Sequence, residues 1–224
     1  HGQVVESEKR RQNLARFLPN ALVEKVLSDS QTLELGGLKS RVTTMFCDIR
    51  GSSKLAEQLA PHDLVELLNE HFTAMTELVF HYEGTLDKYI GDEIMAIFGA
   101  PLQSGNEEFR AVCAALDMQR RNNELNFLRS QENRPILQLG IGIDAGEVIA
   151  GYIGSPKRMD FTVVGDRVNT AKRFCDIAEP GKIVVGHTIW EAVKDRVQGV
   201  PMGTQLLKGK EQTVQAYEIT GLRK

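Results

Sequence analysis

Apolar and polar residues follow two periods along this chain, and the changes between them outline the secondary structure. Seven short runs are rich in β-branched and apolar residues or alternate apolar with polar positions, which predicts strands. The predicted strands are residues 42–47, 85–89, 93–98, 137–143, 148–153, 182–185 and 214–219. In four other segments apolar residues recur every three or four positions, which predicts helices. The predicted helices are residues 64–79, 109–116, 168–178 and 189–193.

Glycine and proline mark where these elements start and turn. Pro61 lies near the start of the first long helix. Gly91 lies in the turn of a predicted hairpin, and we expect Ala145-Gly146 to turn the chain between the next two strands. The order strand, helix, hairpin, helix, hairpin, helix, strand contains no internal repeat. It predicts an α+β sandwich with helices on one face of a mainly antiparallel sheet.

A charged segment precedes this domain. Residues 6–27 carry a helical pattern and many charges, and Gly36-Gly37 separates them from the first strand. We therefore predict a helical lead or linker at residues 1–40 and one domain at residues 41–224. A polar helix at a terminus is either solvated or pairs with a copy of itself, and both alternatives stay open here.

Composition excludes several classes of protein. The 224 residues are 42% hydrophobic and 25% charged, which is ordinary for a folded globular domain. The net charge of -3 predicts neither a nucleic-acid nor a membrane-surface partner. Cys47, Cys113 and Cys175 lie far apart and predict free thiols in a reducing, cytoplasmic location. The sequence contains neither a membrane-spanning run nor a signal peptide.

The first candidate for chemistry is the run Asp48-Ile49-Arg50-Gly51-Ser52. A carboxylate at a strand end, followed by a Gly/Ser turn into a helix, places a metal ligand beside free backbone N–H groups. Such a loop can hold a polyphosphate without a lysine. The alternative is an aspartate that closes a strand before a serine-capped helix.

A second run, Lys88 to Glu93, contains a Gly-Asp turn that can be structural only. Its Asp92, like Asp48, closes a strand next to a tight turn. Two carboxylates brought together from adjacent strands can hold two divalent ions for in-line phosphoryl chemistry.

The third run is the helix that contains Asn169 and Arg173. The two residues are one turn apart and share a helix face. A guanidinium beside an amide suits a phosphoryl group and a sugar, although the same residues also fit a solvated face. The chain has no GxxxxGK[ST] and no HExxH motif, which argues against a P-loop or a zincin mechanism.

Together these segments resemble the class III nucleotide cyclase catalytic domain, the family of adenylyl and guanylyl cyclases. The resemblance runs from about residue 42 to 219. Its motifs are FCDIRGS at 46–52, KYIGD at 88–92, VGDRVNTAKR at 164–173 and LKGK at 207–210. It implies a ferredoxin-like βαββαβ core with a mainly antiparallel sheet.

The resemblance also implies a role for each site residue. Asp48, Asp92 and the Ile49 carbonyl correspond to the ligands of two Mg²⁺ or Mn²⁺ ions per active site. Lys88 and Thr162 occupy the positions that read the base, with the lysine donating to adenine N1 and the threonine accepting from the exocyclic amine. The remaining substrate contacts are the Gly51-Ser52 turn for phosphates, Asn169 for the ribose, Arg173 for the α-phosphate and Lys208 for the terminal phosphates.

These roles predict an adenylate cyclase, a phosphorus–oxygen lyase that converts ATP to 3′,5′-cyclic AMP and pyrophosphate in signal transduction. Because one chain holds every role, the resemblance implies a homodimer with shared active sites. Residues 154–161 correspond to the family's dimerisation arm. Thr162 marks a subgroup with bicarbonate-responsive members, and the lead falls where relatives carry a linker from upstream sensor domains. The alternatives are a guanylate or diguanylate cyclase and a non-catalytic dimerising sensor module.

Overall fold

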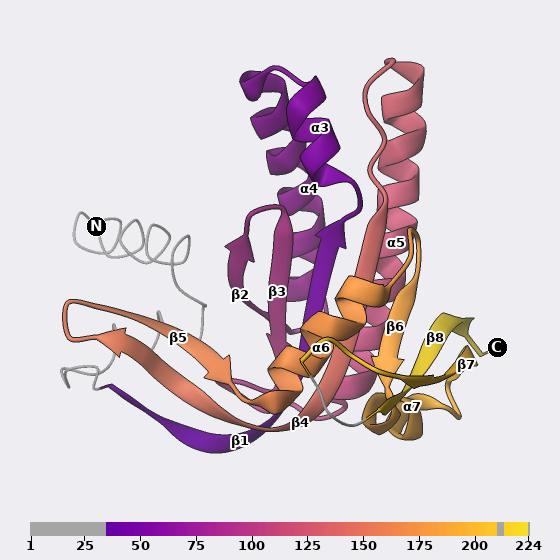
Figure 1. Cartoon of the computed structure of the whole chain (residues 1–224). Coiled ribbons are helices and arrows are strands. Elements are labelled where there is room, and N and C mark those ends of the chain that lie inside the picture. Colours follow the sequence, from indigo (N-terminus) through magenta and orange to yellow (C-terminus); the bar gives the residue numbers. More distant parts are fainter. Residues whose placement is uncertain (1–34, 210–212, 224) are drawn as a thin grey trace, which may run out of the picture.

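A computed structural model describes residues 35–209 and 213–223 of the chain. The predicted helical lead and Lys210 lie outside the described residues, and the domain boundary at residue 40 stays a prediction. Figure 1 shows the described part as one curved sheet with helices packed against it. None of the described helices combines the length and the apolar character needed to cross a membrane.

The described elements alternate between strands and helices in the order expected from the sequence. They are β1 (Gly36–Ile49), α3 (Ser52–Gln58), α4 (Pro61–His81), β2 (Thr85–Ile90), β3 (Glu93–Phe98), α5 (Glu107–Gln131), β4 (Leu139–Ser155), β5 (Arg158–Val164), α6 (Asp166–Ile177), β6 (Ile183–Gly186), α7 (His187–Val193), β7 (Val197–Gln205) and β8 (Val214–Leu222). The hairpin of β2 and β3 is confirmed, with Gly91 at φ 65° in its turn.

The sheet contains the expected ferredoxin-like core. Its strands follow the order β2-β3-β1-β4-β6-β8-β7, and β5 pairs with β4 beside this path. The segment β4-β1-β3-β2, with α4 and α5 as crossover helices, is the βαββαβ unit. β4 pairs with β6 in parallel, whereas the other pairs are antiparallel.

Helices cover both faces of the sheet, so the prediction that all of them share one face is wrong. Met45, Cys47 and Ile49 of β1 pack with α4 and α5 in the largest core cluster. Phe46, which points to the other face because strand side chains alternate, packs in a second cluster that includes Ala171 and Cys175 of α6. α6 lies in front of the sheet in Figure 1, and α5 lies behind it.

The predicted turn at Ala145-Gly146 is also wrong, because β4 continues through it. Ala145 and Gly146 pair with Thr43 and Val42 of β1 in an unbroken register. A Cβ on Gly146 would lie 2.6 Å from Cγ of Arg167. This glycine therefore permits close packing of α6 rather than a turn.

The strands that the sequence pattern missed are exposed on most of their surface. β5 and β7 were not predicted, and β1 begins six residues before the predicted strand. Residues 36–41 of β1 are mostly exposed and pair with residues 147–152 of β4, which extend away from the rest of the sheet (Figure 1). The three cysteines are free thiols, as predicted.

Candidate active site

The two predicted metal-binding carboxylates lie side by side at one edge of the core. Asp48 is the second-last residue of β1, and Asp92 lies in the β2–β3 turn. The backbone N–H of Ile49 donates to Oδ2 of Asp92 across 3.3 Å. The chain thus brings together Asp48, Ile49 and Asp92, although they come from two separate segments of the sequence.

The electrostatics of this pair favour a bound cation. Burial raises the pKa of Asp48 above its usual value, and the neighbouring Asp92 carboxylate raises it further. Arg50 opposes this effect, since its Nη1 donates to Oδ2 of Asp48 at 3.0 Å. Two close carboxylates with a single guanidinium on one of them retain acceptor oxygens for a divalent ion.

The donor set fits Mg²⁺ or Mn²⁺ bound together with a phosphorylated substrate. No group of three or more Asp, Glu, His or Cys residues that could hold a metal occurs within residues 35–209 and 213–223. Asp48 and Asp92 therefore offer two carboxylates rather than a closed cage. Mg²⁺ is commonly held by one or two carboxylates, with substrate phosphates and water completing the shell.

Arg50 joins the carboxylate pair to α6. Besides Asp48, its Nη2 donates to the carbonyl oxygen of Cys175 and lies 3.5 Å from the Cys175 sulfur. The guanidinium packs against Gly140 of β4, where a Cβ would collide with it. Gly140 and Gly142, which lie in a strand as predicted, leave room for Arg50 and for the backbone of α6.

A second ion pair fixes the same helix to the turn that carries Asp92. Nζ of Lys172 donates to Glu93 at 2.5 Å and to Asp176 at 2.8 Å. Burial alone would lower the pKa of Lys172, but these two carboxylates raise it well above its usual value. Arg173 also contacts Asp176, with Nη1 at 3.1 Å from Oδ2. α6 is therefore held by charged contacts along the side that meets the carboxylate pair.

The two residues predicted to read the base meet at a carboxylate that the sequence interpretation missed. The Thr162 hydroxyl on β5 donates to Oδ2 of Asp87 at 2.5 Å. Nζ of Lys88 lies 3.7 Å from Oδ1 of the same residue. The structure thus brings Lys88 and Thr162 together on opposite sides of Asp87, although β2 and β5 do not pair in the sheet.

The remaining predicted site residues lie on α6 and in two loops. Asn169 and Arg173 share α6, where Asn169 is exposed and Arg173 is half-buried. Gly51, at φ 75°, precedes α3, and Ser52 is the first residue of that helix. Lys208 is exposed, while its neighbour Leu207 is buried in a cluster with Phe174 of α6. No described contact joins these residues to the carboxylate pair.

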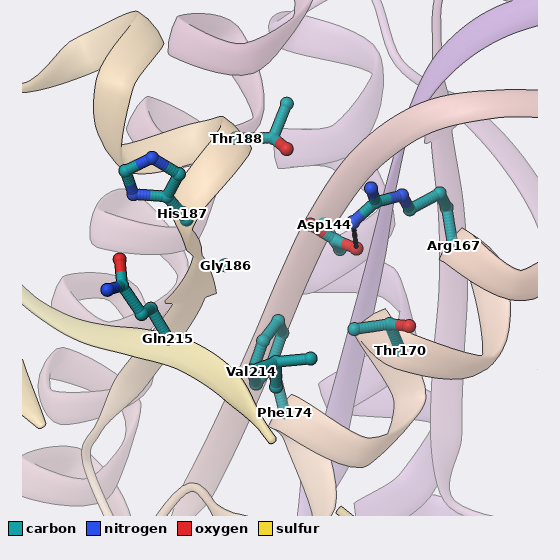
Figure 2. Close-up of a pocket in the computed structure, with 9 residues that line it drawn as sticks. All are labelled: Asp144, Arg167, Thr170, Phe174, Gly186, His187, Thr188, Val214 and Gln215. Atoms are coloured by element: carbon teal, nitrogen blue, oxygen red, sulfur yellow. Dashed lines mark hydrogen bonds and ion pairs between the residues drawn. The ribbon is translucent and has the colours of Figure 1, made fainter. Parts of the chain in front are cut away.

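A cleft of about 280 Å³ opens on the neighbouring face of α6. It is lined by Asp144, Arg167, Thr170, Phe174, Gly186, His187, Thr188, Val214 and Gln215 (Figure 2). Nη1 of Arg167 donates to Oδ2 of the buried Asp144 at 3.4 Å on one side of it. Thr170 and Phe174 follow Asn169 and Arg173 by one residue, which is a rotation of about 100° around the helix. The predicted site residues therefore do not line this cleft.

Comparisons with known proteins agree with the arrangement. The family profile described as adenylate and guanylate cyclase catalytic domain matches residues 37–221. An adenylate cyclase of Anabaena cylindrica is 31% identical over 226 residues, which cover 95% of this chain and 43% of that protein. This chain spans well under half of the length of the curated relatives that it matches.

Solved structures with both nucleotide specificities resemble the fold. The adenylyl cyclase CyaB from P. aeruginosa superimposes with a TM-score of 0.81 at 31% identity, covering 84% of this chain and 98% of CyaB. The guanylyl cyclase Cya2 superimposes with a TM-score of 0.79 at 34% identity, covering 84% of this chain and 96% of Cya2. Overall similarity therefore does not separate ATP from GTP as the substrate.

Proposed function

The chain belongs to the adenylate and guanylate cyclase catalytic-domain family, and on that premise we propose that it converts ATP to 3′,5′-cyclic AMP and pyrophosphate. The observation that carries the choice of ATP is the meeting of Lys88 and Thr162 at Asp87. An ammonium donor and a hydroxyl acceptor match N1 and the 6-amino group of adenine. The same pair mismatches guanine, which presents an N1–H donor and a 6-oxo acceptor.

The residues of the chain divide the work of the reaction. Lys88 and Thr162 orient the base, Asn169 orients the ribose, and the 3′-oxygen attacks the α-phosphorus in line. Arg173, released from Asp176 or shared with it, neutralises charge that develops on the α-phosphate. The Gly51-Ser52 turn and Lys208 hold the other phosphates. Two Mg²⁺ or Mn²⁺ ions at Asp48, Asp92 and the Ile49 carbonyl would supply a lowered 3′-hydroxyl pKa and charge for the triphosphate.

A homodimer completes this site in our proposal, with the carboxylate pair of one subunit facing the base-reading and Asn169/Arg173 residues of the other. The extended part of β1, β4 and β5 supports this assembly because it exposes apolar side chains. Leu38 is 79% exposed, and Ile149, Ile153 and Val164 are between 36% and 49% exposed. Apolar residues gathered on an extended surface are typical of a protein interface.

Neutral variants of the carboxylate pair test the two-metal assignment. We expect Asp48→Asn or Asp92→Asn to lower cyclic AMP formation by at least about 10³-fold, because each removes a metal ligand. Asp63→Asn is the matched control, since Asp63 is 66% exposed on α4, away from this turn. Retention of most activity by Asp48→Asn, with Mn²⁺ binding unchanged in a calorimetric titration, would contradict the assignment.

Mixing two inactive variants tests the shared site. Asp48→Asn and Arg173→Ala homodimers should each be inactive, whereas a heterodimer holds one intact site. Random exchange of subunits should then restore about one quarter of the wild-type activity. A mixture that stays inactive although the subunits exchange would overturn the shared site.

The finer partners of this proposal each have a direct test. Stimulation by bicarbonate should appear as increased turnover at fixed pH, and constant turnover would remove bicarbonate from the proposal. A cytoplasmic location fits the free cysteines and the use of ATP. Control by an upstream sensor domain fits the partial coverage of the relatives.

A further inference from the structure

Asp87 is a buried carboxylate behind the two residues that we assign to the base. Its side chain is 0% exposed, whereas the side chain of Lys88 is 40% exposed. One carboxylate oxygen accepts the Thr162 hydroxyl at 2.5 Å, and the other lies 3.7 Å from the Lys88 ammonium. Asp87 therefore contacts both base-reading side chains while being shielded from solvent itself.

A β-bulge explains how Asp87 and Lys88 can serve the same site. Leu86 pairs with Ala96 and Lys88 pairs with Met95, so Asp87 is an extra residue without a partner in the β2–β3 register. Consecutive side chains of a regular strand point to opposite faces of the sheet. A bulge interrupts this alternation and redirects a side chain, which is why bulges are frequent beside active sites.

The contact with Asp87 fixes the hydrogen-bonding polarity of Thr162. A free threonine hydroxyl can both donate and accept, so it could bind either a 6-amino or a 6-oxo purine. An ionised carboxylate only accepts, and the hydroxyl proton of Thr162 is committed to it. The Thr162 oxygen then presents lone pairs, which match the 6-amino group of adenine and repel the 6-oxo group of guanine.

The same carboxylate favours the donor form of Lys88. Its negative charge lies 3.7 Å from Nζ and stabilises the ammonium. An ammonium can donate to the unprotonated N1 of adenine, whereas N1 of a 6-oxopurine carries a hydrogen. Both effects of Asp87 therefore select against 6-oxopurines.

We infer that Asp87 is a specificity-determining positioning residue, which sets the preference for 6-aminopurine nucleotides by holding the proton of Thr162. The inference rests on the proposed function, since it requires Lys88 and Thr162 to contact the base. Asp87 touches neither the ribose nor the phosphates in this arrangement. Its removal should alter the choice of base more than the rate of the chemical step.

The test compares ATP with inosine triphosphate, which carries a 6-oxo group but lacks the 2-amino group of GTP. We expect Asp87→Ala to lower the ratio of kcat/KM for ATP to that for ITP by about three- to tenfold, the range of one neutral hydrogen bond. Asp87→Asn should lower the ratio as well, because its amide can donate to the Thr162 oxygen and release the hydroxyl proton. This second variant keeps the side-chain volume and serves if Asp87→Ala does not fold.

Two controls separate this role from a structural one. In a Thr162→Val background, Asp87→Ala should lose most of its effect on the ratio, because no hydroxyl remains to be oriented. Asp160→Asn removes an exposed carboxylate whose charge acts on Asp87 but which has no described bond to Thr162, so the ratio should stay at the wild-type value.

The outcomes distinguish the inference from the proposed function. An unchanged ATP/ITP ratio in Asp87→Ala and Asp87→Asn, both folded and dimeric, would overturn the role of Asp87 alone. An equal fall of the ratio with and without Thr162 would also overturn it. A wild-type protein that forms no cyclic AMP from ATP would instead refute the proposed function.

Discussion

Gly142 of β4 sets how closely α6 can approach the sheet, and Gly142→Ala tests whether that distance matters for activity. The added methyl group would lie 2.6 Å from Cα of Cys175, and closer still to the Cys175 nitrogen and the Ala171 oxygen. These are backbone atoms of a helix, so they cannot rotate away. Ordinary contact begins at 3.4 Å, and α6 would have to retreat by at least about 0.8 Å.

This displacement predicts two effects of different size. Overpacking of a filled core costs about 1–3 kcal/mol of the free energy of unfolding. A misplacement of about 1 Å in a catalytic group can cost about 10²-fold in rate, and α6 carries both Asn169 and Arg173. We therefore expect kcat to fall by about 10- to 100-fold in a protein that remains folded at 25 °C.

The assay is initial-rate cyclic AMP formation at saturating ATP, together with urea unfolding of the same preparation. Gly221→Ala is the matched control, since a methyl group there lies 4.0 Å from its nearest neighbour, Oε1 of Gln198. It should change neither kcat nor the unfolding midpoint. A Gly142→Ala variant with wild-type kcat and wild-type stability would refute the argument that tight packing of α6 positions the catalytic pair.

Two further predictions concern buried charges beneath the site. His71 is fully buried without a hydrogen-bond partner among the described residues, and burial together with nearby Arg129 lowers its pKa to about 4. Between that pH and the unfolded value of about 6.5 the unfolded state binds more protons, so stability should fall by up to about 1.4 kcal/mol per unit as pH drops; in urea unfolding at pH 5 and 7, His71→Leu should flatten this dependence, and an unchanged slope would contradict the reasoning. Arg129 is 1% exposed and bonded to Glu70 at 2.7 Å and 2.9 Å. Glu70→Ala should therefore cost about 3 kcal/mol and Glu70→Gln much less, and equal costs would show that the ion pair does not matter.

The sequence predicts the part of the fold whose residues alternate between core and solvent. The buried half of β1, the β2–β3 hairpin and α4 all carry such a pattern, and the structure confirms them. β5 and β7 are exposed on most of their length, so burial imposes no period on them. The turn expected at Gly146 fails because the sequence does not reveal the side chain of Arg167 that packs against it.

The candidate site divides in the same way. Asp48 and Asp92 are visible in the sequence because each follows a strand and precedes a tight turn, and the structure places them together. Asp87 and the Arg50 link to α6 depend on a bulge and on contacts between distant segments. No local pattern encodes these features, although an acid directly beside Lys88 is a signal that could have been used.

The central claim is that this domain is a cyclase selective for ATP. The most direct measurement incubates the purified chain with equimolar ATP and GTP and MnCl₂, and quantifies cyclic AMP and cyclic GMP from the same reaction by chromatography. We predict that cyclic AMP forms in large excess, with stoichiometric pyrophosphate, and that formation stops when the metal is chelated. Cyclic GMP as the main product, or cyclic AMP formation that persists after chelation, would contradict the account.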